Sequence, residues 1–193
     1  GVGVSKPDGA VSIRASRYST GLSLFSVSSF RVRPARTSDI PAIQGLVEPL
    51  VQRRILLGKD RVVLYEAVPE FRVAEDENGA LIGCGALHVM WEDLGEVRTL
   101  AVTESWLGRG VGHALLEQVE ADVRGYGVSR LFCITFETDF FGQHGFEPIA
   151  EDVVAADVYT QLALSPDEGV AEFLDLSRVK QNTLGNTRML KRI

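Results

Sequence analysis

The sequence predicts an α/β fold in which helices flank a central mixed sheet. The first observation is the order of the predicted elements, which is βααβββαβαβ along the chain. The second is the segment Glu96–Leu116, where a β-branched strand runs through a glycine-rich loop into an amphipathic helix. The third is SRLFCITFE at 129–137, an almost uninterrupted apolar run typical of a strand buried on both faces. Together they predict one domain over residues 30–193.

A strand and two helices open this domain. The strand FRVRPA begins at Phe30, and Thr37 and Ser38 follow as candidate N-caps of a helix. A second short helix is predicted around Val62 to Ala67, closed by Pro69 because proline breaks a helix interior. The first helix has one apolar face, with residues spaced by three and four: Ile40, Ile43, Leu46, Val47, Leu50 and Val51.

A β-hairpin, a strand and a helix follow. FRVAED and ALIGCGALHVMWE flank an Asn78-Gly79 turn, the strongest short signal for a hairpin. GEVRTLAV at 95–102 adds another strand. The next helix lies within Arg109 to Tyr126 and packs on the sheet by an apolar stripe with a four-residue repeat: Val111, Leu115, Val119 and Val123.

The C-terminal part continues the alternation of helices and strands. TDFFGQHGFEPI predicts a short helix that ends at Gly145, with a strand after it. A further helix is expected near Val153 to Leu162 and a last strand near Thr187 to Ile193.

Residues 1–29 form a separate extension in this interpretation. Eight of them are serine, and three basic residues stand against the single acid Asp8. Ser- and Arg-rich, acid-poor N-termini are typical of transit peptides, while vector-derived residues or upstream read-through fit the composition equally well. We expect a flexible tail that takes no part in the fold.

Composition excludes several functional classes. The net charge of −6 argues against a nucleic-acid surface, which needs an excess of Lys and Arg. No apolar run approaches the ~20 residues of a membrane span, and we expect a cytoplasmic protein. Cys84 and Cys133 lie in apolar strand-like runs, so we expect buried, reduced thiols. Three isolated histidines without neighbouring ligands predict no metal site.

The glycine-rich loop indicates an anion site. Gly108, Gly110 and Gly112 precede a helix whose first N–H groups are unpaired and carry partial positive charge. A P-loop is excluded because no Lys-Ser or Lys-Thr follows the glycines. A dinucleotide fingerprint is excluded because His113 occupies the place of its third glycine.

The segment LGRGVG from Leu107 to Gly112 resembles the acyl-coenzyme A loop of the Gcn5-related N-acetyltransferases, [QR]xxGx[GA]. Leu107 departs from the usual Gln or Arg, and Phe141 stands where the family's YxxxGF segment has Tyr. Four longer stretches are similar to the short, single-domain N-acetylglutamate synthases of actinobacteria: LYEAVPEFRVAED, IGCGALHVMWEDLGEVRTLAV, TFETDFFGQHGF and VAEFLDLSRVKQNTLGNTRML.

The resemblance implies a fold, a co-substrate and a reaction. The fold is a mostly antiparallel mixed sheet in which two parallel strands, here GEVRTLAV and RLFCITFE, splay apart around the thioester of acetyl-coenzyme A. The backbone of Leu100 is expected to stabilise the oxyanion, and Glu96 is expected to act as the general base. The implied residues for acetyl-coenzyme A are Leu100, Ala101, Val102, Leu107, Gly108, Arg109, Gly110, Val111, Gly112, His113 and Phe141.

The implied acceptor is the α-amine of L-glutamate, whose carboxylates need cationic partners. Arg98 is the first choice because strand alternation puts it on the same face as Glu96 unless a bulge intervenes. Further candidates are Arg54, Lys59, Lys180, Asn182, Asn186 and Arg188.

Alternatives to this function remain open. L-glutamine or another small amine would use the same chemistry. A coenzyme A-binding regulatory module without catalysis would account for the two departures at Leu107 and Phe141. A homodimer is also compatible with the fold.

Overall fold

The computed structural model describes residues 29–149, 153–176 and 185–193. It confirms the predicted fold class, a mixed sheet flanked by helices. Within the described residues, seven strands form one sheet in the order β1-β2-β3-β4-β5-β7-β6. Among the described strands, β4 pairs with β5 in parallel and the other neighbouring pairs are antiparallel. The strands are β1 (Phe30–Pro34), β2 (Phe71–Asp76), β3 (Leu81–Trp91), β4 (Leu94–Val102), β5 (Arg130–Thr135), β6 (Glu147–Pro148) and β7 (Thr187–Arg192).

Six α-helices are described, together with three short 3-10 helices. The α-helices are α1 (Ile40–Gln52), α2 (Arg61–Glu66), α3 (Val111–Gly125), α4 (Thr138–Gln143), α5 (Ala156–Leu162) and α6 (Glu168–Phe173). The 3-10 helices are η1 (Thr37–Asp39), η2 (Val68–Glu70) and η3 (Glu104–Trp106).

Three details differ from the prediction. Thr37 and Ser38 do not cap α1, because they lie inside η1 and the Asp39 carboxylate accepts the Arg36 backbone N–H at 2.7 Å. The helix expected from Val153 begins later, at Ala156. Helix α6 was not predicted, because six residues are too short for a 3.6-residue apolar period to be legible.

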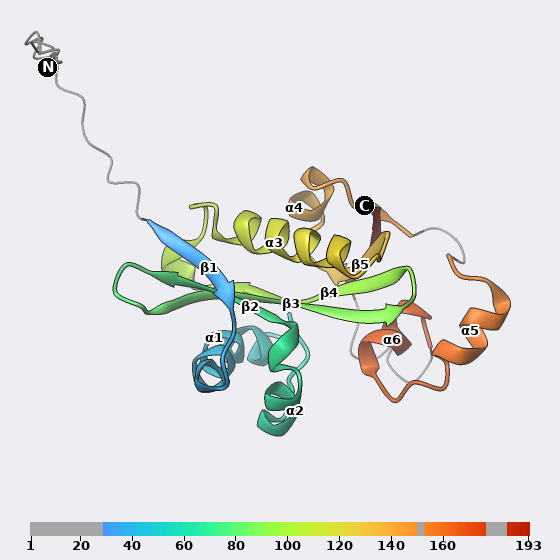
Figure 1. Ribbon diagram of the computed structural model, residues 1–193, viewed down its shortest axis with the longest axis horizontal. Helices are drawn as coiled ribbons and strands as arrows, with labels where there is room; N and C mark the ends of the chain where they lie inside the picture. The colour runs from blue at the N-terminus through green and yellow to red at the C-terminus, as the bar shows by residue number, and fades with distance from the viewer. Residues whose placement is uncertain (1–28, 150–152, 177–184) are drawn as a thin grey trace, which may run out of the picture.

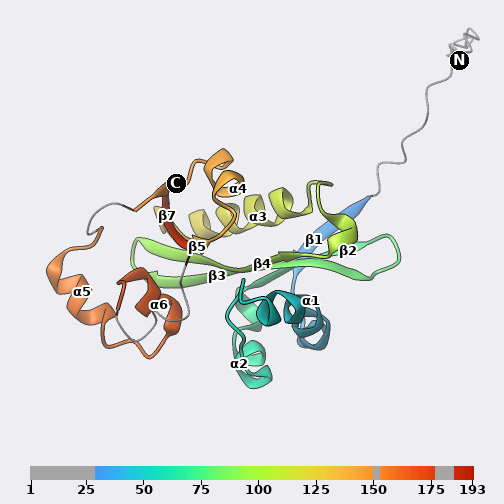
Figure 2. The ribbon, with the colours of Figure 1, turned by 180° about the vertical axis from the view of Figure 1, so that it is seen from behind.

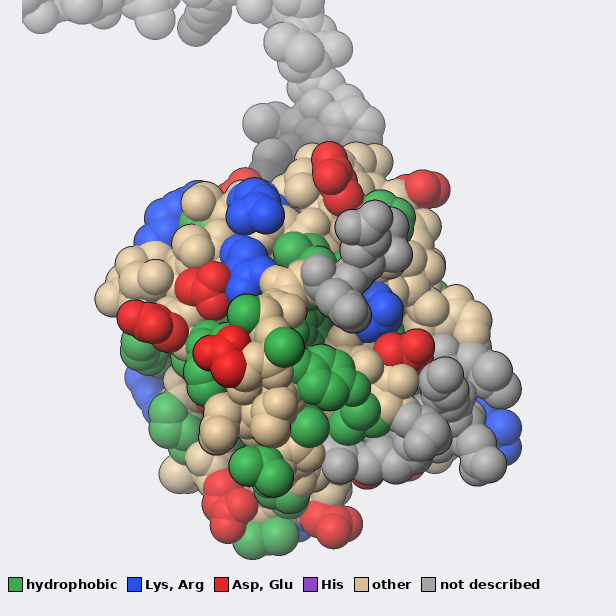
Figure 3. Space-filling view, turned by 90° about the vertical axis from the view of Figure 1, so that its right-hand side faces the viewer, with side chains coloured by type: hydrophobic (Ala, Val, Ile, Leu, Met, Phe, Trp, Pro, Cys, Tyr) green, Lys and Arg blue, Asp and Glu red, His purple; other side chains and the backbone are tan. Residues whose placement is uncertain are grey.

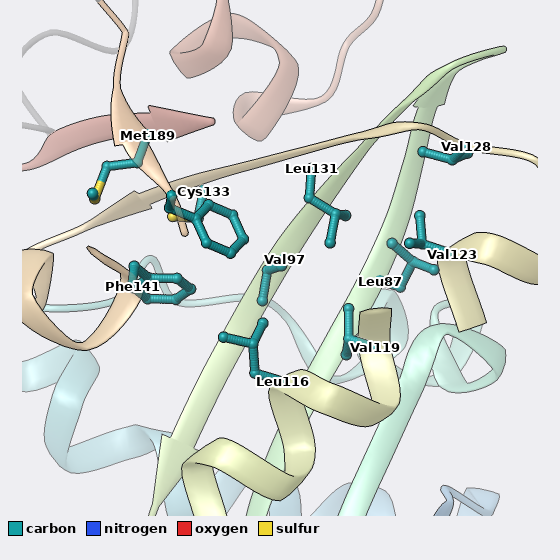
Figure 4. Close-up of a cluster of buried hydrophobic side chains, with 11 residues drawn as sticks. Leu87, Val97, Leu116, Val119, Val123, Val128, Leu131, Cys133, Phe141 and Met189 are labelled. Atoms are coloured by element: carbon teal, nitrogen blue, oxygen red, sulfur yellow. The ribbon is translucent and has the colours of Figure 1, made fainter. Parts of the chain in front are cut away.

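The helices cover the two faces of the sheet (Figure 1). Helices α3 and α4 lie on one face, and α1, α2 and α6 lie on the other. The view from behind shows the same division (Figure 2). Side chains along β4 point alternately to these two faces, and Val97 belongs to the apolar cluster that contains α3 residues (Figure 4).

Helices α5 and α6 lie at one end of the molecule (Figure 1). The view of that end shows hydrophobic side chains gathered between acidic and basic ones (Figure 3). The exposed apolar side chains of this segment include Leu164, which is 75% exposed, and Tyr159. Beneath the surface, Phe132 of β5 packs edge-to-face on Phe173 of α6 with ring centroids 5.0 Å apart. This contact anchors α6 on the sheet.

The face covered by α3 is held by an apolar core (Figure 4). The α3 residues predicted to face the sheet are fully or almost fully buried, as the four-residue repeat indicated: Val111, Leu115, Val119 and Val123. Cys133 of β5 and Met189 of β7 join this core with Phe141 of α4. Cys133 and Cys84 are buried free thiols, as predicted.

Candidate active site

A cleft of about 200 Å³ lies on the face covered by α1, α2 and α6. Its floor comes from β3 and β4, and its walls come from α2, η2 and the residue that precedes α6. The charged lining residues are of both signs. The basic ones are Lys59 and Arg98, and the acidic ones are Glu66, Glu70 and Asp167. His88 of β3 also lines the cleft.

Strand β4 is irregular where it borders this cleft. Its parallel pairing with β5 covers only Leu94 to Glu96, so the two strands separate beyond Glu96. On the other side, Arg98 pairs with Ala86 and Ala101 pairs with Cys84, which leaves Thr99 and Leu100 as a β-bulge. Thr99 has φ +53°, a left-handed conformation that is uncommon for a β-branched residue. The predicted splay of the two strands is therefore present.

Glu96 and Arg98 lie on the same face of β4, because the bulge falls after Arg98. Arg98 Nε donates to Glu96 Oε2 at 2.6 Å. The Arg98 guanidinium also binds Asp167 through both terminal nitrogens, with Nη1 2.9 Å from Oδ2. Arg98 thus joins the carboxylate of Glu96 to that of Asp167, which is 69 residues from Arg98 in the sequence.

Burial and charge oppose each other in this cluster. Burial raises the pKa of Glu96, which is 4% exposed, although Arg98 works in the opposite direction. Burial alone would raise the pKa of Asp167 as well, but the hydrogen bond from Arg98 brings it down to about 2. Burial alone would lower the pKa of Arg98, but the Glu96 and Asp167 carboxylates have the larger effect and raise the pKa of Arg98. Asp167 is therefore ionised at neutral pH.

Helix α6 covers Glu96 and Arg98. Asp167 caps the helix, since its Oδ1 accepts the Val170 N–H at 3.0 Å. A Cβ at Gly169 would lie 2.5 Å from Arg98 Nη2 and 3.0 Å from Glu96 Oε1. Such contacts leave no room for a side chain, so only glycine permits this approach. Glu172 in the same helix is 4% exposed, and burial raises its pKa to about 7.

His88 stands on β3 directly opposite Glu96 of β4. Its Nδ1 lies 2.8 Å from Oε1 of Glu70 in η2. The side chains of His88 and Glu70 are 25% and 30% exposed, so both reach the cleft from a partly covered position.

The glycine-rich loop lies on the other face, at the start of α3. Gly108 has φ +73° and Gly110 has φ +83°, both in the left-handed region that favours glycine. Gly110 is the N-cap residue of α3 and offers no side-chain cap, and nothing lies within 4 Å of a Cβ at either glycine. The loop therefore presents open backbone at the N-terminus of a 15-residue helix.

The other loop residues sit in different environments. The Leu107 side chain is 62% exposed, and the Arg109 guanidinium lies 5.0 Å from the centre of the Trp106 ring. His113 stacks on His144 with ring centroids 4.7 Å apart, and Phe140 lies beside both rings. Burial is the main cause that lowers the pKa of His144.

Phe141 lies in the hydrophobic core and is 5% exposed. It makes edge-to-face contacts with Phe140 and Phe146. Phe140 is the ring that approaches the loop, since a Cβ at Gly112 would lie 3.4 Å from it. The expectation that Phe141 binds the co-substrate stays a prediction, and core packing is its visible role.

The structure brings Lys59 and Arg98 together but does not bring all predicted acceptor residues to the cleft. Arg54 is exposed just beyond α1 and does not line it. Arg188 Nη1 instead donates to the Phe173 carbonyl oxygen at the end of α6. Lys180 and Asn182 lie outside the described residues.

Sequence reasoning missed five residues of this site: Glu70, His88, Asp167, Gly169 and Glu172. His88 could have been found from strand alternation once the β3–β4 register was fixed. The three C-terminal residues carry no local signal, because their role depends on a contact across the whole domain.

The described part of the chain contains neither a group of metal ligands nor a helix that could span a membrane. Within residues 29–149, 153–176 and 185–193, no group of His, Cys, Asp and Glu side chains is arranged to hold a metal ion. No described helix combines the length and apolar character needed to cross a membrane.

Comparison with known proteins agrees with the resemblance found in the sequence. Residues 50–146 match the model of the Acetyltransferase (GNAT) family. A Mycobacterium tuberculosis protein named amino-acid acetyltransferase is 53% identical over 161 residues, covering 82% of this chain and 92% of the relative. A protein of the same name from Neisseria meningitidis is 36% identical over 138 residues, which span 31% of its length.

Solved structures show the same relationship. Rv2747 from Mycobacterium tuberculosis, in complex with CoA and NLQ, has a TM-score of 0.81 and 52% identity. That match covers 84% of this chain and 99% of the Rv2747 chain. N-acetylglutamate synthase from Neisseria gonorrhoeae, complexed with coenzyme A and N-acetyl-glutamate, has a TM-score of 0.67 and 28% identity. It is matched over 86% of this chain but only 35% of its own length.

Proposed function

Because the chain belongs to the Acetyltransferase (GNAT) family, we propose that it transfers an acetyl group from acetyl-coenzyme A to the α-amine of L-glutamate. This reaction is the first step of arginine biosynthesis. The observation that carries the proposal is the position of the cleft, which contains Lys59 and Arg98 and reaches the β4 bulge at Thr99. The names of the Mycobacterium and Neisseria relatives support the same activity.

The residues of the loop fit acetyl-coenzyme A. Open backbone at Gly108 and Gly110 and the start of a long helix suit a pyrophosphate, which needs close approach and N–H donors. Val111, Gly112 and His113 would supply the first N–H groups of α3, with Leu107 and Arg109 beside them. The co-substrate brings an activated thioester carbonyl, and the chain has to hold and polarise it.

The bulge in β4 suits the polarising role. Thr99 and Leu100 fall outside the regular pairing with β3, and pairing with β5 has already ended at Glu96. A backbone N–H at Leu100 would donate to the carbonyl oxygen as negative charge develops, and Ala101 and Val102 would flank the pantetheine arm. Donors held in place before the reaction stabilise that charge without further reorganisation.

Lys59 is the better placed partner for an acceptor carboxylate. Both basic residues line the cleft, but Arg98 already binds Glu96 and Asp167. A substrate carboxylate would have to share Arg98 with Asp167 or displace Asp167 from Arg98. Lys59 has neither of these partners, and an ammonium group can follow a carboxylate through three rotatable donors. The assignment of Arg54, Asn182 and Arg188 to acceptor binding stays a prediction.

The resemblance to the family implies that Glu96 is the general base, and this role stays a prediction. The carboxylate is buried beneath α6 and bonded to Arg98, so it does not line the cleft. Transfer of a proton from an acceptor amine to Glu96 would need a water molecule that passes Arg98.

L-glutamine is a second candidate acceptor, and the lining charges favour it. Three carboxylates, Glu66, Glu70 and Asp167, stand against the two cations Lys59 and Arg98. An acceptor with one amide in place of a carboxylate would meet less repulsion from this lining.

The direct test is thiol release from acetyl-coenzyme A by the full chain with L-glutamate, L-glutamine and a panel of other amines. Release that requires glutamate or glutamine supports the proposal and ranks the two acceptors. If no amine of the panel causes thiol release while the chain still binds acetyl-coenzyme A, the result would instead support a regulatory module that has lost catalysis.

Three broader assignments belong to the proposal. We expect residues 30–193 to form one acetyltransferase domain, with 1–29 as an extension that activity does not need. Turnover by a chain that starts at Phe30 would test this. A cytoplasmic location and a homodimer stay predictions, and sedimentation of the purified chain would decide the second.

A further inference from the structure

We propose that His88, oriented by Glu70, accepts the proton that the acceptor ammonium must lose before it attacks the thioester. The inference rests on the proposed acetyltransferase function and names a catalytic residue for it.

The position of His88 places its ring on the reactive face of the sheet. His88 and Glu96 are directly opposite in the β3–β4 register, and Ala86 and Arg98 form the next opposite pair on that face. His88 also lines the cleft together with Thr99, the first residue of the β4 bulge. A substrate held in the cleft would therefore lie between the imidazole and the bulge.

Glu70 fixes the orientation and tautomer of the ring. Its Oε1 lies 2.8 Å from His88 Nδ1, and a carboxylate at that distance holds the proton on Nδ1. The Nε2 lone pair is then available to accept a proton. A carboxylate that orients a histidine in this way also stabilises the imidazolium that forms.

Glu96 is less well placed to touch the amine. It is 4% exposed, its Oε2 accepts a hydrogen bond from Arg98, and Gly169 of α6 lies against both carboxylate oxygens. It does not line the cleft, whereas His88 and Glu70 do. The geometry assigns Glu96 to holding Arg98 in place.

The charges around His88 favour an ammonium group nearby. Its charged neighbours come from every element around the cleft: Lys59 before α2, Glu66 of α2, Glu70 of η2, Glu96 and Arg98 of β4, and Asp167 before α6. Four of these six groups are carboxylates. An acceptor ammonium is attracted to them, while its carboxylate is drawn to Lys59.

The step balances without another reactant. The ammonium gives one proton to His88 Nε2, and the freed nitrogen lone pair forms a bond to the thioester carbonyl carbon. The resulting oxyanion collapses, the carbon–sulfur bond breaks, and the sulfur leaves with its electron pair. A second proton passes from the nitrogen to the thiolate, the third stays on the amide, and His88 releases its proton to solvent through the cleft.

The test compares wild type, His88→Gln, Glu70→Gln and Glu96→Gln in the full chain. Turnover with L-glutamate and L-glutamine is measured from pH 5 to 9, the range in which imidazoles generally change charge, and acetyl-coenzyme A affinity is measured by titration. We expect His88→Gln to lower turnover by roughly 10²-fold and to remove the acid limb of the profile, with acetyl-coenzyme A affinity unchanged. Glu70 is a positioning residue, so Glu70→Gln should move the limb with a smaller loss.

Glu96→Gln separates the two candidate bases, because it should slow turnover and keep the acid limb. If His88→Gln keeps the limb and Glu96→Gln removes it, Glu96 is the base and the inference is wrong. Wild type that releases no thiol with any amine would instead overturn the proposed function.

A second variant guards against loss of folding. His88→Ala opens space in the cleft, and added imidazole should restore turnover in proportion to the concentration of its neutral form. The role of His88 would be overturned if His88→Ala turned over as fast as wild type. It would also be overturned if His88→Ala still bound acetyl-coenzyme A but did not respond to imidazole.

Discussion

The two faces of β4 present opposite kinds of side chain within three residues. Val97 points into the apolar core under α3, whereas Glu96 and Arg98 on either side of it point into an ion-paired cluster under α6. The same contrast holds for the surroundings. The α3 face ends in a loop of open backbone, and the α6 face ends in a cleft lined by charged side chains.

This difference indicates a division of labour between the faces. Backbone donors bind an anion whatever side chains surround them, so the α3 face can hold a co-substrate while its helix packs on an apolar core. An amino acid has charged groups that must be distinguished, which requires placed side chains of both signs. Strand alternation lets one strand serve both purposes.

The largest expected effect comes from the charged face. Glu96→Gln should lower turnover by about 100-fold, roughly 2.7 kcal/mol, because Arg98 loses one of its two carboxylate partners on the strand that forms the floor of the cleft. Acetyl-coenzyme A affinity should change little, since the loop lies on the other face. Steady-state kinetics and titration with acetyl-coenzyme A check both parts, and unchanged turnover across pH would exclude Glu96 from catalysis.

The next effect concerns stability on the same face. Burial raises the pKa of Glu172 from 4.5 to about 7, so the folded chain binds more protons than the unfolded chain between these values. Stability from this group is therefore complete below about pH 4.5 and is lost as pH rises through about 7, by about 2 kcal/mol between pH 5 and 7.5. Urea unfolding at pH 5 and 7.5 should show a smaller fall for Glu172→Gln than for wild type. Glu168→Gln, on the exposed side of α6, is the control and should keep most of the fall.

A smaller effect is expected on the loop of the other face. Gly110→Ala forces a Cβ onto a residue at φ +83°, which should cost about 1 kcal/mol and weaken acetyl-coenzyme A binding roughly tenfold. Gly125→Ala is the matched control, because Gly125 ends the same helix without a positive φ or a close neighbour. Equal affinity in the two variants would argue against the loop as the co-substrate site.

The smallest effect should distinguish two basic residues near the cleft. Lys59→Gln should raise the KM for L-glutamate by about threefold to tenfold, the range for one exposed or half-buried charge contact. Arg54→Gln should raise it less, because Arg54 is exposed and does not line the cleft. The reverse order would place the acceptor carboxylate on the α1 side.

Much of the fold and half of the site follow from local patterns. The apolar stripe of α3, the hairpin of β2 and β3, and the glycines of the loop are each decided by a few neighbouring residues. The shared face of Glu96 and Arg98 follows from strand alternation, although the sequence does not show that the bulge begins only after Arg98.

The rest of the site depends on contacts that no local pattern encodes. Asp167 reaches Arg98 across 69 residues, and Gly169 matters only because α6 lies on Glu96. The burial of Phe141 in the hydrophobic core depends on how α4 packs, which no local pattern encodes. His88 can be recognised as a site residue only once the β3–β4 register is known, because that register puts it opposite Glu96.

The most direct test of the division between faces measures two constants in two variants. Acetyl-coenzyme A affinity and the KM for L-glutamate are determined side by side for wild type, Lys59→Gln and Gly110→Ala. The division predicts that Lys59→Gln changes only the KM for L-glutamate and that Gly110→Ala changes only acetyl-coenzyme A affinity. If Lys59→Gln weakens acetyl-coenzyme A binding while the KM for L-glutamate stays constant, the cleft does not bind the acceptor and the account is contradicted.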